Sequence, residues 1–217
     1  MKFYPCFFFR KLSANLSRRE SKTALFHSLI NLKLRGRLGK EELEFLCDET
    51  KLDEKEIKTK YKLFLESHPE GEISQESFDK LLSECFPASR LEHIGQHTWR
   101  MFDINMDGVI DFSEFLVVVN IMSNGSAEQN LQQIFRFFDV NRNGTIEKLE
   151  MTNVVKDLFG AEHNHNDEEK LAQEAFTEMD ENHDDLVSLE EFTRACLSNK
   201  KYSSVLTMKV VNLFLDK

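Results

Sequence analysis

Apolar residues recur every three to four positions along most of this chain of 217 residues, with polar residues between them. This spacing gives each segment one apolar face and is typical of amphipathic helices. It predicts helices at residues 25–34, 41–50, 53–65, 75–85, 91–102, 112–122, 127–138, 148–159, 168–179 and 189–197, and a last helix with an apolar stripe of Leu206, Val210, Leu213 and Phe214. Between them, the Gly- and Ser-containing residues 123–126 predict a linker, and residues 160–167 predict a loop.

The polar segment at residues 103–114 carries oxygen-bearing side chains at its positions 1, 3, 5, 9 and 12 and Gly108 at position 6. This is the spacing of an EF-hand calcium loop, where alternate residues offer oxygens to a hard cation. Position 7 contributes a backbone carbonyl, the glutamate at position 12 contributes two oxygens, and glycine permits the sharp turn. The predicted ligands are Asp103, Asn105, Asp107, Val109, Asp111 and Glu114.

The same motif occurs twice more, which predicts three calcium sites, with magnesium as the alternative occupant at rest. The loop at residues 139–150 offers Asp139, Asn141, Asn143, Thr145 (carbonyl), Glu147 and Glu150. The loop at residues 180–191 offers Asp180, Asn182, Asp184, Leu186 (carbonyl), Ser188 and Glu191. In this loop Asp185 replaces the glycine at position 6, so we expect a strained and weaker site.

A fourth, degenerate copy occupies residues 66–77. It keeps Gly71 and Ile73 at positions 6 and 8, but His68 offers no oxygen at position 3, and Pro69 stiffens the turn. Ser77 stands where a bidentate carboxylate is required. We therefore expect this loop to bind no ion.

Position 8 of the four loops is β-branched: Ile73, Ile110, Ile146 and Val187. Paired EF-hands join their loops by a short antiparallel bridge at this position, which β-branched residues favour. The sequence therefore predicts an all-α protein with four EF-hands in two paired lobes joined by short β-bridges. The predicted domains are a basic arm at residues 1–40, a first pair at 41–122 and a second pair with the last helix at 127–217.

The net charge of −10 conceals a strong asymmetry. Residues 1–40 hold ten Lys or Arg and one acid, whereas the remainder is acidic. An acidic body suits cation binding and argues against nucleic acid as a partner, and a basic arm suits an anionic membrane face or an acidic protein. Cys6 lies among Phe residues beside Arg10 and Lys11 and is a candidate acylation site. The alternative is a tail that covers the protein's own apolar groove.

The four cysteines have neither disulfide nor metal spacing, which predicts a reduced, cytoplasmic chain. No apolar run reaches the length of a membrane span, so any membrane contact is expected to be peripheral, through the arm. No nucleophile–base pair, P-loop or dinucleotide fingerprint occurs, and the acids are explained as calcium ligands. The sequence therefore predicts a protein that is not an enzyme.

Residues 43–215 resemble the neuronal calcium sensor family, which includes frequenin, recoverin, the visinin-like proteins and the potassium-channel-interacting relatives. The resemblance depends on the first loop disabled around Pro69 and Gly71, on three intact loops, and on residues before and between them: Glu56, Ile57, Tyr61, Phe64, Phe86, Pro87, Ser123, Gly125 and Leu131. Many members begin Met-Gly and are myristoylated on that glycine. Here residue 2 is lysine, so a myristoyl switch is not expected.

The resemblance implies a calcium sensor that exposes an apolar groove for an amphipathic helix of a target, such as a membrane-associated channel, cyclase or kinase. The groove residues it implies are Phe64, Phe78, Leu81, Leu82, Phe86, Trp99, Phe102 and Phe115, for which core packing is the alternative. Lys60 and Cys85 depart from the family's usual aromatic residues. A calcium buffer and a constitutive calcium-binding subunit of an enzyme are the competing functions.

Overall fold

The computed structural model describes residues 38–84, 86, 88–159, 165–202, 206 and 210. Its contacts divide the chain into two units, Met1–Cys85 with Phe102–Ser126 and Phe86–Met101 with Ala127–Lys217, which are called the first and second units. The structure is mostly helical with two small antiparallel strand pairs, which confirms the predicted all-α EF-hand fold. The predicted helix at residues 25–34, Cys6, Cys85, Leu213 and Phe214 lie outside the described residues.

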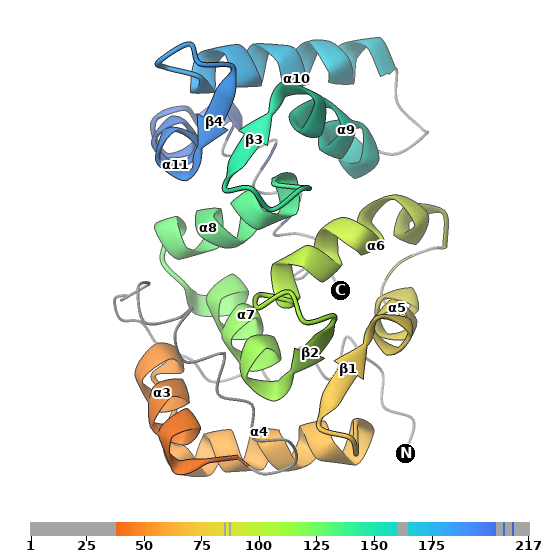
Figure 1. Ribbon diagram of the computed structural model, residues 1–217, viewed down its shortest axis with the longest axis vertical. Coiled ribbons are helices and arrows are strands. Elements are labelled where there is room, and N and C mark those ends of the chain that lie inside the picture. The colour runs from red at the N-terminus through yellow and green to blue at the C-terminus, as the bar shows by residue number, and fades with distance from the viewer. Residues whose placement is uncertain are drawn as a thin grey trace. The chain divides into compact units, whose positions relative to one another are not determined.

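In the described part of the first unit, helices precede the first strand and follow each of the two strands (Figure 1). These elements are α3 (Lys40–Thr50), α4 (Glu54–Ser67), β1 (Glu72–Ser74), α5 (Gln75–Ser83), β2 (Val109–Asp111) and α7 (Phe112–Asn124). Helix α7 is buried at every residue from Phe112 to Met122. A helix that is apolar all round must be enclosed by its neighbours, and α3 packs along it.

The second unit takes nearly all of α6 (Ala88–Phe102) and the elements that follow α7. These elements are α8 (Ala127–Phe138), β3 (Thr145–Glu147), α9 (Lys148–Phe159), α10 (His165–Met179), β4 (Leu186–Ser188), α11 (Leu189–Ser198) and α12 (Lys200–Tyr202). Leu206 and Val210, from the predicted apolar stripe, are fully buried. These two residues therefore pack as the stripe predicts.

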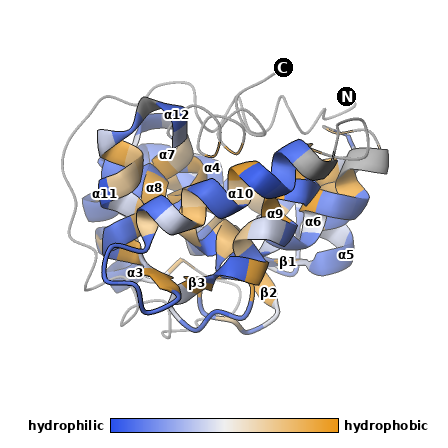
Figure 2. Cartoon of the chain, turned by 90° about the horizontal axis from the view of Figure 1, so that it is seen from above, coloured by the Kyte–Doolittle hydropathy of each residue, from blue (hydrophilic) through white to orange (hydrophobic). Residues whose placement is uncertain are grey.

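The strand pairs join the loops at the predicted positions. Strands β1 and β2 are antiparallel with Ile73 opposite Ile110, and β3 and β4 are antiparallel with Ile146 opposite Val187. All four side chains have no exposed surface, so the bridges also close the inner end of each loop pair. Figure 2 shows hydrophilic residues along the loops near β2 and β3, whereas the helices carry both colours.

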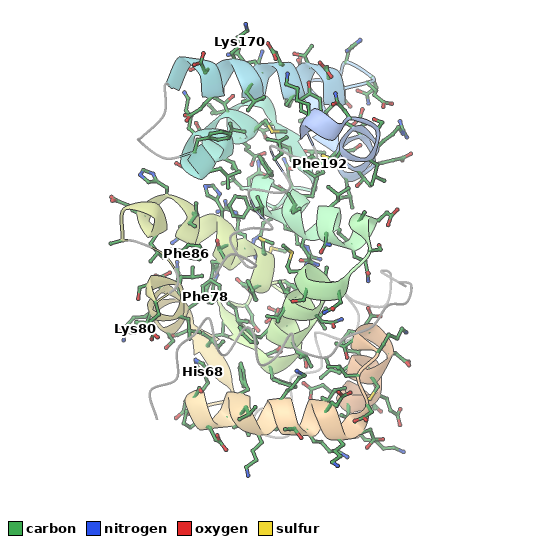
Figure 3. The ribbon with its side chains drawn as sticks, turned by 180° about the vertical axis from the view of Figure 1, so that it is seen from behind. His68, Phe78, Lys80, Phe86, Lys170 and Phe192 are labelled. Atoms are coloured by element: carbon green, nitrogen blue, oxygen red, sulfur yellow. The ribbon has the colours of Figure 1, made fainter. Side chains whose placement is uncertain are left out.

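Most of the largest fully buried side chains are phenylalanines. In the first unit Phe64 and Phe102 lie 5.9 and 5.7 Å from Phe115, measured between ring centroids. In the second unit Phe192 lies 5.7 Å from Phe135 and 5.9 Å from Phe138. Figure 3 shows Phe192 directed inward from α11 and Lys170 directed outward from α10. The helix faces therefore sort apolar from charged residues as the periodicity predicts.

Two predicted connections are shorter in the structure. Helix α7 continues to Asn124, so only Gly125 and Ser126 of the predicted linker are non-helical. The hydroxyl of Ser123 donates to the carbonyl of Val119 at 2.8 Å, a bond that lets serine remain helical. Helix α10 begins at His165 and not at Glu168, with acids in its first turn where they favour the helix dipole.

Candidate calcium-binding loops

In the loop at residues 103–114, Glu114 links both ends of the segment. Its Oε1 accepts the backbone N–H groups of Ile104 and Asn105 at 3.0 and 3.1 Å, and its Oε2 accepts that of Asp111 at 3.1 Å. Asp111 caps α7 and accepts the N–H of Glu114 at 2.8 Å, which forms a capping box. Positions 9 and 12 therefore both begin the helix and hold the start of the loop beside it.

Between these ends, short polar side chains shape the turn. The amide oxygen of Asn105 accepts the N–H of Asp107 at 2.9 Å, and Asp107 accepts that of Val109 at 3.0 Å. Met106 and Gly108 take positive φ angles of 62° and 83°. Open space surrounds the place of a Cβ on Gly108, so backbone conformation, not crowding, is the reason for glycine there.

The loop at residues 139–150 repeats this construction. Glu150 accepts the N–H groups of Asn141 and Glu147, both at 2.9 Å, from the two ends of the loop. Asp139 accepts the N–H groups of Asn143 and Gly144 at 3.1 and 3.0 Å. The carboxylate at position 1 thus holds the turn at positions 5 and 6.

The loop at residues 180–191 keeps the construction without glycine. Asp180 accepts the N–H groups of Asp184 and Asp185, both at 3.1 Å, and Glu191 accepts the N–H and hydroxyl of Ser188 at 2.9 and 2.7 Å. Asp185 has φ +64°, the left-handed conformation that a side chain disfavours, as its position predicted.

The degenerate loop at residues 66–77 lacks the link between its ends. Ser77 only donates its N–H to Ser74, at 3.3 Å, and accepts the Ser74 hydroxyl at 3.1 Å. His68 ends α4 with its N–H bonded to the Phe64 carbonyl at 2.8 Å, and its ring packs 5.2 Å from that of Phe64 (Figure 3). Burial lowers the pKa of His68 and favours its neutral form, so position 3 offers no negative charge.

The glutamates at position 12 differ in their electrostatics. Burial, together with the carboxylate of Asp111, raises the pKa of Glu114 to about 8, against the N–H groups that lower it. Burial raises the pKa of Glu191 too, but hydrogen bonds from Ser188 and from the N–H groups of Asn182 and Glu181 outweigh it, and the pKa of Glu191 is lowered. The ionised form of Glu114 is therefore the less stable of the two, and a nearby cation would stabilise it most.

These residues fit a hard divalent cation. The donors are carboxylate, amide and carbonyl oxygens at the required spacing, and position 6 has positive φ in all three loops. Among the described residues, no three His, Cys, Asp or Glu side chains converge to form a metal site, because the carboxylates accept backbone N–H groups instead. To bind an ion, several of these oxygens must therefore give up their hydrogen bonds to backbone N–H groups and coordinate the ion instead.

The predicted groove residues lie mainly in the interior. Six of the eight are at most 7% exposed, whereas Leu81 and Phe86 are half-buried. Phe78 lies 5.2 Å from Phe102 between ring centroids, and Figure 3 shows Phe78 on the inner side of α5 with Lys80 on its outer side. Lys60 is also buried, which lowers its pKa. The groove remains a prediction, since these side chains now form the core.

Sequence reasoning missed two side-chain contacts between residues far apart in the sequence. The hydroxyl of Ser113, at position 11 of the first intact loop, donates to Glu42 of α3 at 2.5 Å. His97 of α6 bonds to Asp157 of α9 at 2.8 Å. The partners are 71 and 60 residues apart, so no local pattern indicates either pair.

Comparison with known proteins agrees with this geometry. The model of an EF-hand domain pair matches residues 128–197, and an EF-hand model matches residues 99–119. Recoverin from Homo sapiens is 33% identical over 175 residues, covering 76% of this chain and 88% of recoverin. Neuronal calcium sensor 1 from Lymnaea stagnalis is 34% identical over 183 residues, covering 81% and 96%.

S-modulin from Aquarana catesbeiana is 34% identical over 175 residues, covering 76% of this chain and 87% of S-modulin. None of the helices in the described part of the chain is long and apolar enough to cross a membrane. The EF-hand loops, together with relatives above 30% identity across most of the chain, support calcium binding. The chain belongs to the neuronal calcium sensor family of EF-hand proteins, which are regulatory proteins and not enzymes.

Proposed function

We propose that this protein is a calcium sensor with three working sites, at residues 103–114, 139–150 and 180–191, and that it regulates a membrane-associated protein target. The proposal is supported by the position of three glutamates, Glu114, Glu150 and Glu191. Each accepts a backbone N–H group at the start of the exiting helix, and each occupies position 12, the last ligand position of its loop. A side chain that begins the exiting helix and also binds the ion transmits ion binding to that helix.

Movement of these glutamates provides the switch. A bound ion supplies positive charge that neutralises the carboxylates. Glu114 is the N3 residue of α7, so turning its carboxylate toward an ion pulls the first turn of α7 with it. The Phe64, Phe102 and Phe115 cluster lies behind that turn, and a change in helix angle uncovers these rings as the groove for an amphipathic target helix.

Calorimetric titration of single variants tests the three sites. Glu114→Gln, Glu150→Gln and Glu191→Gln each keep the size of the side chain and remove its charge. We expect each variant to lose one of three binding events, with the loops at residues 103–114 and 139–150 binding more tightly than the loop at 180–191. Sites of this class bind at about 10⁻⁷–10⁻⁵ M. Titration with magnesium measures whether that ion occupies the loops at rest.

Exposure of the groove separates a sensor from a buffer. A sensor increases the fluorescence of a dye that binds apolar surface when calcium is added, whereas a buffer barely opens. Phe64, Phe102 and Phe115 have no exposed surface, so the increase expected from their release is large. An unchanged dye signal with three ions bound would point to a buffer. Stable co-purification with a large partner in chelator would favour a constitutive subunit of an enzyme.

Peripheral membrane contact through the basic arm is the second part of the proposal. Its support is the sequence alone: ten basic residues between positions 1 and 40, with Cys6 among phenylalanines. Each Lys or Arg near anionic lipid contributes on the order of 1 kcal/mol. Fractionation of cells that express the wild type or Cys6→Ser tests acylation, and an equal distribution of the two would rule out an essential acyl anchor.

A further inference from the structure

His97 connects three helices of the second unit. Its ring lies 5.1 Å from that of Phe137 on α8, between ring centroids, and its Nε2 lies 2.8 Å from the Asp157 carboxylate on α9. His93, one turn earlier on α6, has its Nδ1 3.5 Å from the other oxygen of Asp157. Only 8% of the His97 side chain is exposed. Helix α6 is therefore attached to both helices that flank the loop at residues 139–150.

The hydrogen-bond partners of His97 fix its proton. Arg100 contacts Nδ1 of His97, and a guanidinium can only donate, so Nδ1 is the acceptor. The ring proton is then on Nε2, from which it is donated to Asp157. This chain of directed bonds, from Arg100 through His97 to Asp157, holds α6 to α9 in one arrangement.

Arg100 also lies in the field of the loop at residues 139–150. Burial and the cation of Arg142 lower the pKa of Arg100 to about 10, and the carboxylates of Glu150, Asp139 and Asp157 oppose that shift. Glu150 and Asp139 are the last and first predicted ligands of the loop. Neutralisation of these two carboxylates by an ion would remove part of the attraction that holds Arg100 in place.

A change in the angle between α8 and α9 cannot leave the His97 contacts intact. Asp157 is seven residues beyond Glu150, which places it about 10 Å along α9. Opening of a sensor hand by about 40° would displace that point by about 6–7 Å relative to α8. A hydrogen bond does not survive beyond about 3.5 Å, so α6 must follow one helix and release the other.

We infer that His97 is a positioning residue that couples two calcium loops: through its contacts with Phe137 and Asp157, the position of α6 depends on the angle between α8 and α9. Helix α6 ends at Phe102, and the next residue, Asp103, is the first predicted ligand of the loop at residues 103–114. Ion binding at residues 139–150 is therefore communicated to the loop at 103–114. This inference rests on the proposed calcium-sensing function.

Trp99 is the single tryptophan of the chain, lies on α6 two residues after His97 and is 7% exposed. Its fluorescence therefore reports on the surroundings of α6. The experiment uses the full chain with Glu114→Gln, which disables the loop that follows α6. Calcium is titrated while Trp99 emission is recorded, and calorimetry records ion binding in parallel. We expect Trp99 emission to change as the loop at residues 139–150 fills, and this change to disappear when Glu150→Gln is added.

His97→Leu in the Glu114→Gln background should keep ion binding in calorimetry but reduce the Trp99 change by at least about threefold, because coupling through a removed contact is lost. His97→Gln retains an N–H for Asp157 and should restore most of the change. Lys156→Gln is the matched control, since Lys156 pairs with Glu169 of α10 at 3.0 Å and not with α6. Asp157→Ala provides a second disruption at a partly exposed position, should His97→Leu unfold.

The outcomes distinguish the inference from the function on which it rests. A Trp99 change of equal size in His97→Leu and Asp157→Ala overturns the coupling, as does a change that persists with Glu150→Gln. If calorimetry detects no ion binding in the wild type, the calcium-sensing proposal itself fails. If ions bind and Trp99 does not respond in the Glu114→Gln protein, the sensor proposal stands and the coupling through His97 is refuted.

Discussion

Replacement of Glu114 by glutamine removes a predicted calcium ligand and should make the calcium-free protein increasingly stable, relative to wild type, as pH rises. The pKa of Glu114 is raised from 4.5 to about 8 by burial and by the Asp111 carboxylate. Between these two values the folded protein keeps a proton that the unfolded chain has released. The stability due to this group is full below the unfolded pKa and is lost as pH rises through the folded pKa, at about 1.4 kcal/mol per pH unit.

The size of the effect follows from the same shift. Between about pH 5.5 and 7.5, the free energy of unfolding of Glu114→Gln should gain about 2–3 kcal/mol relative to wild type. Glutamine keeps one acceptor oxygen for the N–H groups of Ile104 and Asn105 and loses the acceptor for Asp111. That loss costs about 1–3 kcal/mol at any pH, so the change with pH is the diagnostic quantity.

Urea unfolding in chelator, at several pH values, measures this difference. Glu191→Gln is the matched control, because the pKa of Glu191 is lowered and the group contributes stability above its unfolded pKa that is lost as pH falls. Between about pH 5.5 and 7.5 the stability difference between Glu191→Gln and wild type should therefore stay constant, whereas the difference for Glu114→Gln grows with pH. Parallel curves for wild type and Glu114→Gln would refute the view that burial of this carboxylate opposes its ionisation.

Three other substitutions have definite expected outcomes. Gly125→Ala would place a Cβ 2.5 Å from the Ile121 carbonyl oxygen, so the end of α7 must shift, and thermal unfolding should show a loss of about 1–3 kcal/mol. Phe115→Ala removes the ring that both Phe64 and Phe102 contact, and should cost about 3–5 kcal/mol in urea unfolding. Asp185→Gly relieves a positive φ of 64° and should raise the free energy of unfolding in chelator by about 1 kcal/mol. An unchanged or lower stability would show that the charge of Asp185 matters more than its backbone.

The sequence predicted those parts of the structure that depend on neighbouring residues. Ile73 and Ile110, and Ile146 and Val187, pair as position 8 of the loops requires, because the loop geometry and the strand preference of β-branched residues act together. Most helix boundaries agree with the apolar periodicity within a few residues. The positive φ of Asp185 follows from its place in the motif.

What could not be predicted depends on tertiary contact. The residue pattern places Gly125 in a linker, but its φ of −65° is ordinary, and the structure requires glycine because its backbone lies close to Ile121. His97 and Asp157 are unremarkable helix residues until α6 and α9 meet. The target groove is the clearest case, because the same periodicity describes a core and a binding face. Six of its eight residues are buried in this structure.

The three glutamates at position 12 show why ion affinity cannot be deduced from the ligand pattern. The motif assigns them one role, and all three accept N–H groups at the start of an exiting helix. Yet Glu114 lies where burial and Asp111 oppose its charge, whereas hydrogen bonds from Ser188 favour the charge of Glu191. An ion beside Glu114 would be attracted more strongly because it stabilises a disfavoured negative charge, but it must displace a proton near neutral pH. An ion beside Glu191 would meet a carboxylate that is already ionised. The ranking of the sites therefore depends on burial around each loop as much as on the number of its acids.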